Sequence, residues 1–144
     1  MTFVLWLHIF AAIFVIGPLT VAMSAAPGAI KDGAEGLPLL RWFHRTTRYY
    51  GLGSLLVIAT GAWVVPLTKD VSFSSGWLSA AMAMFIVAIL LVLFSAREQG
   101  KAVAAIEAGQ DAAVEAGRMS AVAGFTGLLW MAILVLMVWH PGTQ

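Results

Sequence analysis

The chain has 144 residues, of which 61% are hydrophobic and only 10% are charged. An ordinary soluble domain carries roughly 25% charged residues, so this composition excludes a soluble fold and makes the lipid bilayer the natural solvent. The formal net charge of +1 and the lack of dense Lys/Arg runs give no basis for a nucleic-acid partner. The absence of cysteine excludes disulfides and thiolate metal sites.

Four long apolar runs follow one another along the chain, and each is close to the ~20 residues that cross a hydrocarbon core of about 30 Å. None of the runs contains Asp, Glu, Lys or Arg. Because backbone groups in lipid must be satisfied within their own segment, all four runs are expected to be helices. The sequence therefore predicts an all-α fold, a bundle of four transmembrane helices in a single membrane domain over residues 1–144, with helices at about 3–23, 49–65, 77–94 and 119–139.

The first run, from Phe3 to Met23, is long enough to span the bilayer and lacks the basic start of a cleaved signal peptide. We therefore expect it to be retained as a helix. It holds His8, the one ionisable side chain within the four runs, about 9 Å along the helix axis from Thr2. Gly17-Pro18 predicts a kink, because proline removes a backbone donor and crowds the carbonyl four residues earlier.

The segment 27–48 leads into the second helix and is basic. Arg41, Arg45 and Arg48 recur there at helical spacing, which predicts a helix lying in the membrane interface against anionic lipid. An alternative role for these arginines is to hold a carboxylate or a propionate group. We expect His44, in the same segment, to face solvent or lipid headgroups.

The segment 97–118, between the third and fourth helices, is rich in Ala and Glu, which favour helix. We expect it to extend both helices, with a turn at Gly109-Gln110. Asp111 is expected to cap the returning helix.

The distribution of basic residues predicts the orientation in the membrane. Seven of the eight Lys and Arg residues lie in segments 27–48 and 97–118, and the link between helices two and three has only Lys69. The positive-inside rule makes the two basic segments cytoplasmic. The expected protein is thus a multi-pass protein of the cell (inner or plasma) membrane, with the N-terminus and the C-terminus outside.

His8 is the first candidate for chemistry, because ionisable side chains inside membrane helices are costly and are often functional. A neutral imidazole at this position could bind haem iron or copper, or relay a proton. The alternative is a structural histidine, hydrogen-bonded to a neighbouring helix or to water.

Three further residues, Met82, Met137 and His140, are expected near the same outer surface as His8. Thioether sulfur and imidazole nitrogen suit Cu(I), so the four residues form a candidate copper site. The alternative is that the methionines fill gaps in the bundle and that His140 is an ordinary interfacial histidine.

Three stretches of the chain resemble bacterial membrane proteins of one group. They are LWLHIFAAIFVIGP (Leu5–Pro18), RTTRYYGLGSLLVIATGAW (Arg45–Trp63) and LLWMAILVLMVWHPG (Leu128–Gly142). The chain resembles an uncharacterised four-helix family related to copper-resistance protein D and to the membrane-type protoporphyrinogen oxidase. The resemblance implies that His8 matches the first-helix histidine, a haem-ligand candidate in the oxidase. Unlike the oxidase, this sequence has no Arg or Lys within its apolar runs.

Two functional hypotheses follow. In the first, the chain is a haem-b-binding or redox-linked membrane protein with His8 as a ligand; a methionine or an open position, rather than His140, lies opposite. In the second, it is a non-catalytic membrane subunit, or a copper-related transport or permeability factor. The sequence leaves open whether the protein is an enzyme. It also leaves open whether, besides the lipid bilayer, the chain has a second copy or a membrane complex as its partner.

Overall fold

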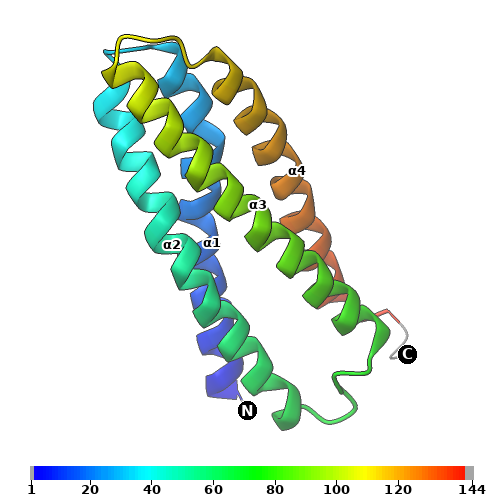
Figure 1. Ribbon diagram of the computed structural model, residues 1–144. Helices are drawn as coiled ribbons and strands as arrows, with labels where there is room; N and C mark the ends of the chain where they lie inside the picture. The colour runs from blue at the N-terminus through cyan, green and yellow to red at the C-terminus, as the bar shows by residue number, and fades with distance from the viewer. Residues whose placement is uncertain (1, 142–144) are drawn as a thin grey trace.

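The computed structural model describes residues 2–141 and consists of four long helices (Figure 1). These are α1 (Thr2–Lys31), α2 (Leu37–Val64), α3 (Gly76–Glu107) and α4 (Ala113–Trp139). All four are long and apolar enough to cross a membrane, and no β-strand occurs within the described residues. The predicted fold, an all-α bundle of four transmembrane helices, is therefore confirmed.

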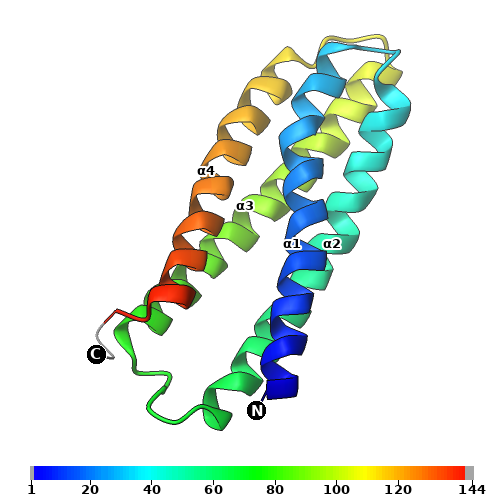
Figure 2. The ribbon, with the colours of Figure 1, turned by 180° about the vertical axis from the view of Figure 1, so that it is seen from behind.

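The connections define two ends of the bundle. Residues 32–36 join α1 to α2 and residues 108–112 join α3 to α4, and Figures 1 and 2 show both turns at the same end. We call this the short-turn end. The start of α1 and the close of α4 lie at the opposite end, the terminal end, together with the longer connection from α2 to α3, which opens with the 3-10 helix η1 (Val65–Leu67).

Helix α1 is longer than the sequence predicted, because it continues past Met23 to Lys31 and contains Pro27. Proline disfavours the interior of a helix, since it lacks a backbone donor. In the structure the added turns bury Ala26, Ala29 and Ile30 against the other helices. This packing stabilises the helical path even though one backbone hydrogen bond is missing.

Helix α2 includes the predicted basic interfacial helix without a break. The segment is helical as expected, but its face with Leu40, Phe43 and Thr47 is buried in the bundle. His44 was expected to face solvent or headgroups, whereas in the structure it is only partly exposed and its Nδ1 is buried. A Cβ built on Gly100 of α3 would lie 3.3 Å from Cε1 of His44, so the imidazole packs in the α2–α3 interface.

The turn between α3 and α4 is close to the prediction. Helix α3 ends at Glu107, Gly109 has a positive φ of 72°, and α4 begins at Ala113. A positive φ costs glycine less than other residues, which explains the reversal of the chain here. The carboxylate of Asp111 accepts a hydrogen bond from the backbone N–H of Ala113 at 3.1 Å. Asp111 was expected to cap α4, but the cap position is held by the next residue, Ala112.

The packed core is concentrated at the short-turn end. There, α1, α2, α3 and α4 contribute to one buried cluster of ten residues, in which alanines alternate with larger side chains such as Leu40 and Met119. The clusters in the middle and at the terminal end have only three fully buried members each. The outward faces carry exposed Leu, Ile, Val, Phe and Trp side chains, as lipid-facing surfaces do.

The orientation predicted from basic residues can be tested by reporter fusions at Gly109 and at Gln144. We expect a cytoplasmic reporter to be active at Gly109 and inactive at Gln144, because the positive-inside rule places the short-turn end in the cytoplasm. An exported reporter provides the matched control and should give the reverse pattern. Cytoplasmic activity at Gln144, or its absence at Gly109, would contradict the orientation.

Candidate functional site

His8 lies in the terminal half of α1 and is bonded to α2. Its Nδ1 is 3.1 Å from the hydroxyl oxygen of Thr60. That hydroxyl donates to the carbonyl oxygens of Leu56, at 2.8 Å, and Val57, at 3.1 Å. A hydroxyl has one hydrogen, and here it is directed to the helix backbone, so the Thr60 oxygen accepts from His8.

This geometry favours the tautomer of His8 in which Nδ1 carries the proton and Nε2 keeps its lone pair. Metal-binding histidines use the same arrangement, in which one ring nitrogen donates to a fixed acceptor while the other binds the metal. The sequence identified His8, but it did not identify Thr60 as its partner, since the two residues are far apart along the chain.

Gly61 makes room for the imidazole on the surface of α2. A Cβ at Gly61 would lie 2.9 Å from Cε1 of His8 and 3.4 Å from Nδ1. Carbon atoms do not approach so closely without displacement, so any larger residue here would move the ring. Gly61 and Thr60 thus hold His8 together, one by shape and the other by a hydrogen bond.

The other residues of the candidate copper site lie elsewhere at the terminal end. The His140 ring contacts Trp77 edge-on, with 4.6 Å between centroids, and Met137 packs against the cluster that includes Trp77. Met82 on α3 is 42% exposed. Met137 and His140 thus both lie near Trp77 of α3. His8, by contrast, contacts Thr60 and Gly61 of α2.

The donor chemistry of His8 fits haem iron or copper, because a neutral imidazole with an anchored Nδ1–H offers Nε2 as a ligand. One surface groove lies between α1 and α4 and another on the outer face of α4, and His8 lines neither of these two grooves. Within residues 2–141, no group of three or more His, Asp and Glu side chains is arranged to hold a metal.

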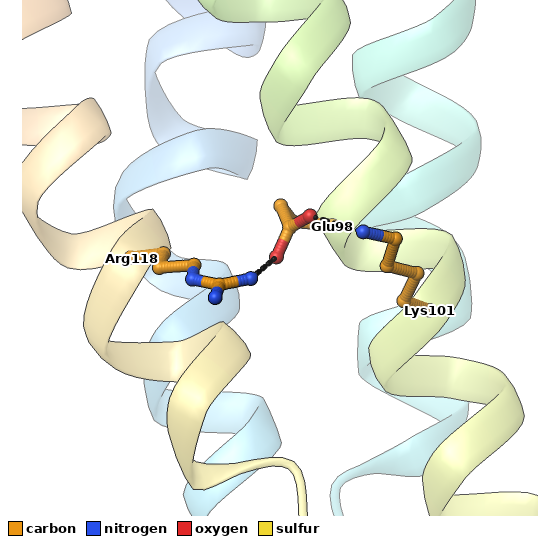
Figure 3. Close-up of polar contacts among 3 residues, drawn as sticks. All are labelled: Glu98, Lys101 and Arg118. Carbon is orange, nitrogen blue, oxygen red and sulfur yellow. Dashed lines mark hydrogen bonds and ion pairs between the residues drawn. The ribbon is translucent and has the colours of Figure 1, made fainter.

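A second polar site, which the sequence analysis missed, centres on Glu98 of α3. This residue is only 1% exposed. Its carboxylate accepts a hydrogen bond from Nζ of Lys101 at 2.9 Å and is 3.5 Å from a guanidinium nitrogen of Arg118 on α4. Figure 3 shows the carboxylate between the two basic side chains, which are each about half exposed. The three residues link α3 to α4 near the short-turn end.

A signal for Glu98 is present in the sequence but lies outside the apolar run. The third apolar run ends at Phe94, so the sequence places Glu98 in the segment predicted to be cytoplasmic. The buried residues of α3 continue at helical spacing through Val92, Ser95, Glu98 and Ala102. If the spacing of three or four residues between buried positions is continued past Phe94, Glu98 falls on the inner face of α3.

Substitution of Glu98 by glutamine is expected to lower the free energy of unfolding by about 1–3 kcal/mol, because a buried charge-assisted interaction is lost. The matched control is Glu107→Gln. Glu107 also pairs with an arginine, Arg41, but both side chains are about half exposed, so a loss below about 1 kcal/mol is expected. Denaturant titration in detergent micelles measures both values. Equal losses in the two variants would show that burial of Glu98 does not strengthen its ion pairs.

Comparisons with known proteins give one match. The family model described as "Predicted integral membrane protein (DUF2269)" matches residues 2–141. Neither a curated protein nor a solved structure matches the chain.

Proposed function

We propose that this chain, which belongs to the DUF2269 family of predicted integral membrane proteins, binds a redox cofactor of the haem b type through Nε2 of His8. The observation that carries the proposal is the hydrogen bond between Nδ1 of His8 and Thr60. Because the Thr60 hydroxyl donates to its own helix, the bond holds the ring in the tautomer that leaves Nε2 as a ligand.

Bound haem would supply one-electron transfer, and the chain itself would supply orientation. Thr60 fixes the proton on Nδ1, and Gly61 allows the ring to approach α2 closely. A fixed second partner of this kind raises the basicity of the ligand and limits its rotation. The resemblance to the first helix of the membrane-type protoporphyrinogen oxidase supports the same assignment.

Haem, if bound, would be held by His8 alone or by His8 together with a methionine. His140 is a poor candidate for the second residue because it lies at the end of α4 in edge-on contact with Trp77, whereas His8 is more than a helical turn inside α1 and bonded to α2.

The test is a visible absorption spectrum of the purified chain, scored as cofactor per folded protein. We expect a Soret band in the wild type, loss of the band in His8→Ala, and retention in His140→Ala. Thr60→Val keeps the side-chain shape but removes the acceptor of Nδ1–H, and it should weaken cofactor affinity about 10- to 100-fold.

Retention of the cofactor in His8→Ala with loss in His140→Ala would contradict the assignment. So would an unchanged affinity in Thr60→Val. A wild-type protein that folds with haem supplied, but gives no Soret band, would favour the second candidate function.

That second candidate is a non-catalytic membrane subunit, in which His8 has a structural role. It is favoured by the fit of the ring against Gly61 and by the hydrogen bond to Thr60, because both also describe a well-packed polar side chain. A copper-related transport role is a further variant, and it would require His8 to approach Met82, Met137 and His140. Copper binding that His8→Ala and Met137→Ala both abolish would support this variant.

A further inference from the structure

Five polar atoms in the short-turn half of the bundle are buried and have no hydrogen-bond partner among the described residues. On α2 they are Nδ1 of His44 and the hydroxyl oxygen of Thr47; on α3 they are the hydroxyl oxygen of Ser95 and both amide atoms of Gln99. Thr47 and Gln99 are 0% exposed, and Ser95 is 1% exposed. Buried polar groups in proteins nearly always have a partner, so these atoms require an explanation. We call the four residues the polar seam.

The two hydroxyls of the polar seam lack a backbone bond that three other threonines of the bundle make. Thr20, Thr60 and Thr126 each donate to a carbonyl oxygen four residues earlier in their own helix. Such a bond satisfies a hydroxyl without any other partner. Thr47 and Ser95 make no such bond, so their oxygens remain available to a group outside their own backbone.

The packing of α2 against α3 brings the seam residues to one stretch of the interface. A Cβ on Gly51 would lie 3.1 Å from Cγ1 of Val92, and a Cβ on Gly100 would lie 3.3 Å from Cε1 of His44. These contacts fix an antiparallel register. Thr47 falls between the two contact points on α2, and on α3 Ser95 and Gln99 fall between the same points.

The seam residues also share helix faces. His44 and Thr47 are three residues apart, and Ser95 and Gln99 are four apart, which are the spacings of neighbours on one side of a helix. The His44 ring is within weak hydrogen-bonding reach of the Gln99 side chain and of the Ala96 carbonyl. By distance and angle, however, Nδ1 of His44 and the two Gln99 amide atoms make no regular hydrogen bond, and these geometric criteria decide here. A small molecule between the helices could bond to atoms of both.

The chemistry of the five atoms identifies the class of that molecule. The Gln99 amide presents an acceptor, Oε1, and a donor, Nε2, and each hydroxyl can do both. A bare cation would leave Nε2 without a partner, and a bare anion would leave Oε1 without one. A neutral hydroxyl group donates and accepts, so it can satisfy both types of atom.

We propose that the polar seam is a binding site for a neutral hydroxyl group, carried either by water or by a small hydroxylated solute. Entry is from the short-turn end, since Gln99 is only about 12 Å of helix from the end of α3 at Glu107. Lipid chains offer no hydrogen bond, so the hydroxyl must come from the aqueous side. The site is independent of His8, which lies toward the terminal end.

The experiment is NMR of the full-length chain in detergent micelles, with water and then glycerol as probes. We expect through-space cross-peaks from bound water to the Gln99 side-chain amide and to the Thr47 methyl group. The matched internal control is the Thr126 methyl group, which is equally buried but whose hydroxyl is bonded to its own helix; no water cross-peak is expected there. If glycerol replaces the water cross-peaks with its own, the natural ligand is a hydroxylated solute, and if it does not, the ligand is water.

Gln99→Met keeps the length of the side chain and removes both amide atoms. It should abolish the water cross-peak at the Thr47 methyl group, whereas Thr126→Val should leave that cross-peak unchanged. If Gln99→Met does not fold, the wild-type measurement decides by itself. Cross-peaks of Gln99 with protein or detergent protons alone would overturn the proposal, and so would a Gln99 amide shift that follows the concentration of sodium chloride.

Discussion

Replacement of Gly36 by alanine is expected to lower the free energy of unfolding by about 3 kcal/mol or more. A Cβ at Gly36 would lie 2.0 Å from the carbonyl oxygen of Ala29 and 2.9 Å from its carbonyl carbon. These are backbone atoms of α1, so relief of the clash requires movement of a whole helix end. The Gly36 carbonyl also accepts the first backbone bond of α2, from Leu40 at 2.9 Å, and displacement would weaken it.

Gly28→Ala is the matched control, because Gly28 lies in α1 near the same turn and a Cβ there would meet nothing within 4 Å. Its higher helix propensity is expected to leave stability unchanged or to raise it by up to about 1 kcal/mol. Denaturant titration in detergent micelles measures both variants. If Gly36→Ala is as stable as Gly28→Ala, the approach of the 32–36 turn to α1 is looser than the structure describes.

Leu40→Ala is expected to cost about 2–5 kcal/mol, since the side chain is fully buried and its removal leaves a cavity. Leu40 is 0% exposed and belongs to the large cluster at the short-turn end, where it packs among small side chains of several helices. Its alanine neighbours cannot expand to fill the space.

The preceding residue provides the control for this second prediction. Leu39 is 50% exposed, so Leu39→Ala removes the same atoms from an exposed position and should change stability by less than about 1 kcal/mol. The same titration measures both. Similar losses at the two positions would show that the core does not lie on the Leu40 side of α2.

The losses of stability expected for these variants bear on function, because His8 and the polar seam lie in parts of the bundle that are packed differently. His8 contacts Thr60 and Gly61 in the terminal half of the bundle, where the buried clusters are small. Glu98 and the polar seam lie next to the dense cluster at the short-turn end. We therefore expect Leu40→Ala to disturb the polar seam more than the His8 tautomer, and Gly61→Ala to do the reverse.

The sequence predicted His8 as a candidate residue because one ionisable side chain within four apolar runs is conspicuous. It did not predict Thr60 or Gly61 as its neighbours, since these common residues become a site only when α1 and α2 are packed in one register. The sequence places Glu98 and His44 outside the bundle, because Glu98 follows the end of the third apolar run and His44 precedes the start of the second. Both contact neighbouring helices because α2 and α3 continue beyond the apolar runs.

The sequence by itself determined the number of helices, their approximate positions and the turn at Gly109, because hydrophobic length and glycine conformation are local properties. The tertiary structure alone decided which polar residues are buried and which of them meet. Helix α1 continues past Pro27 because its added turns bury Ala26 and Ile30. The cost of a missing backbone bond is local, but the burial that offsets it comes from other helices, and the order of residues along one chain does not reveal that burial.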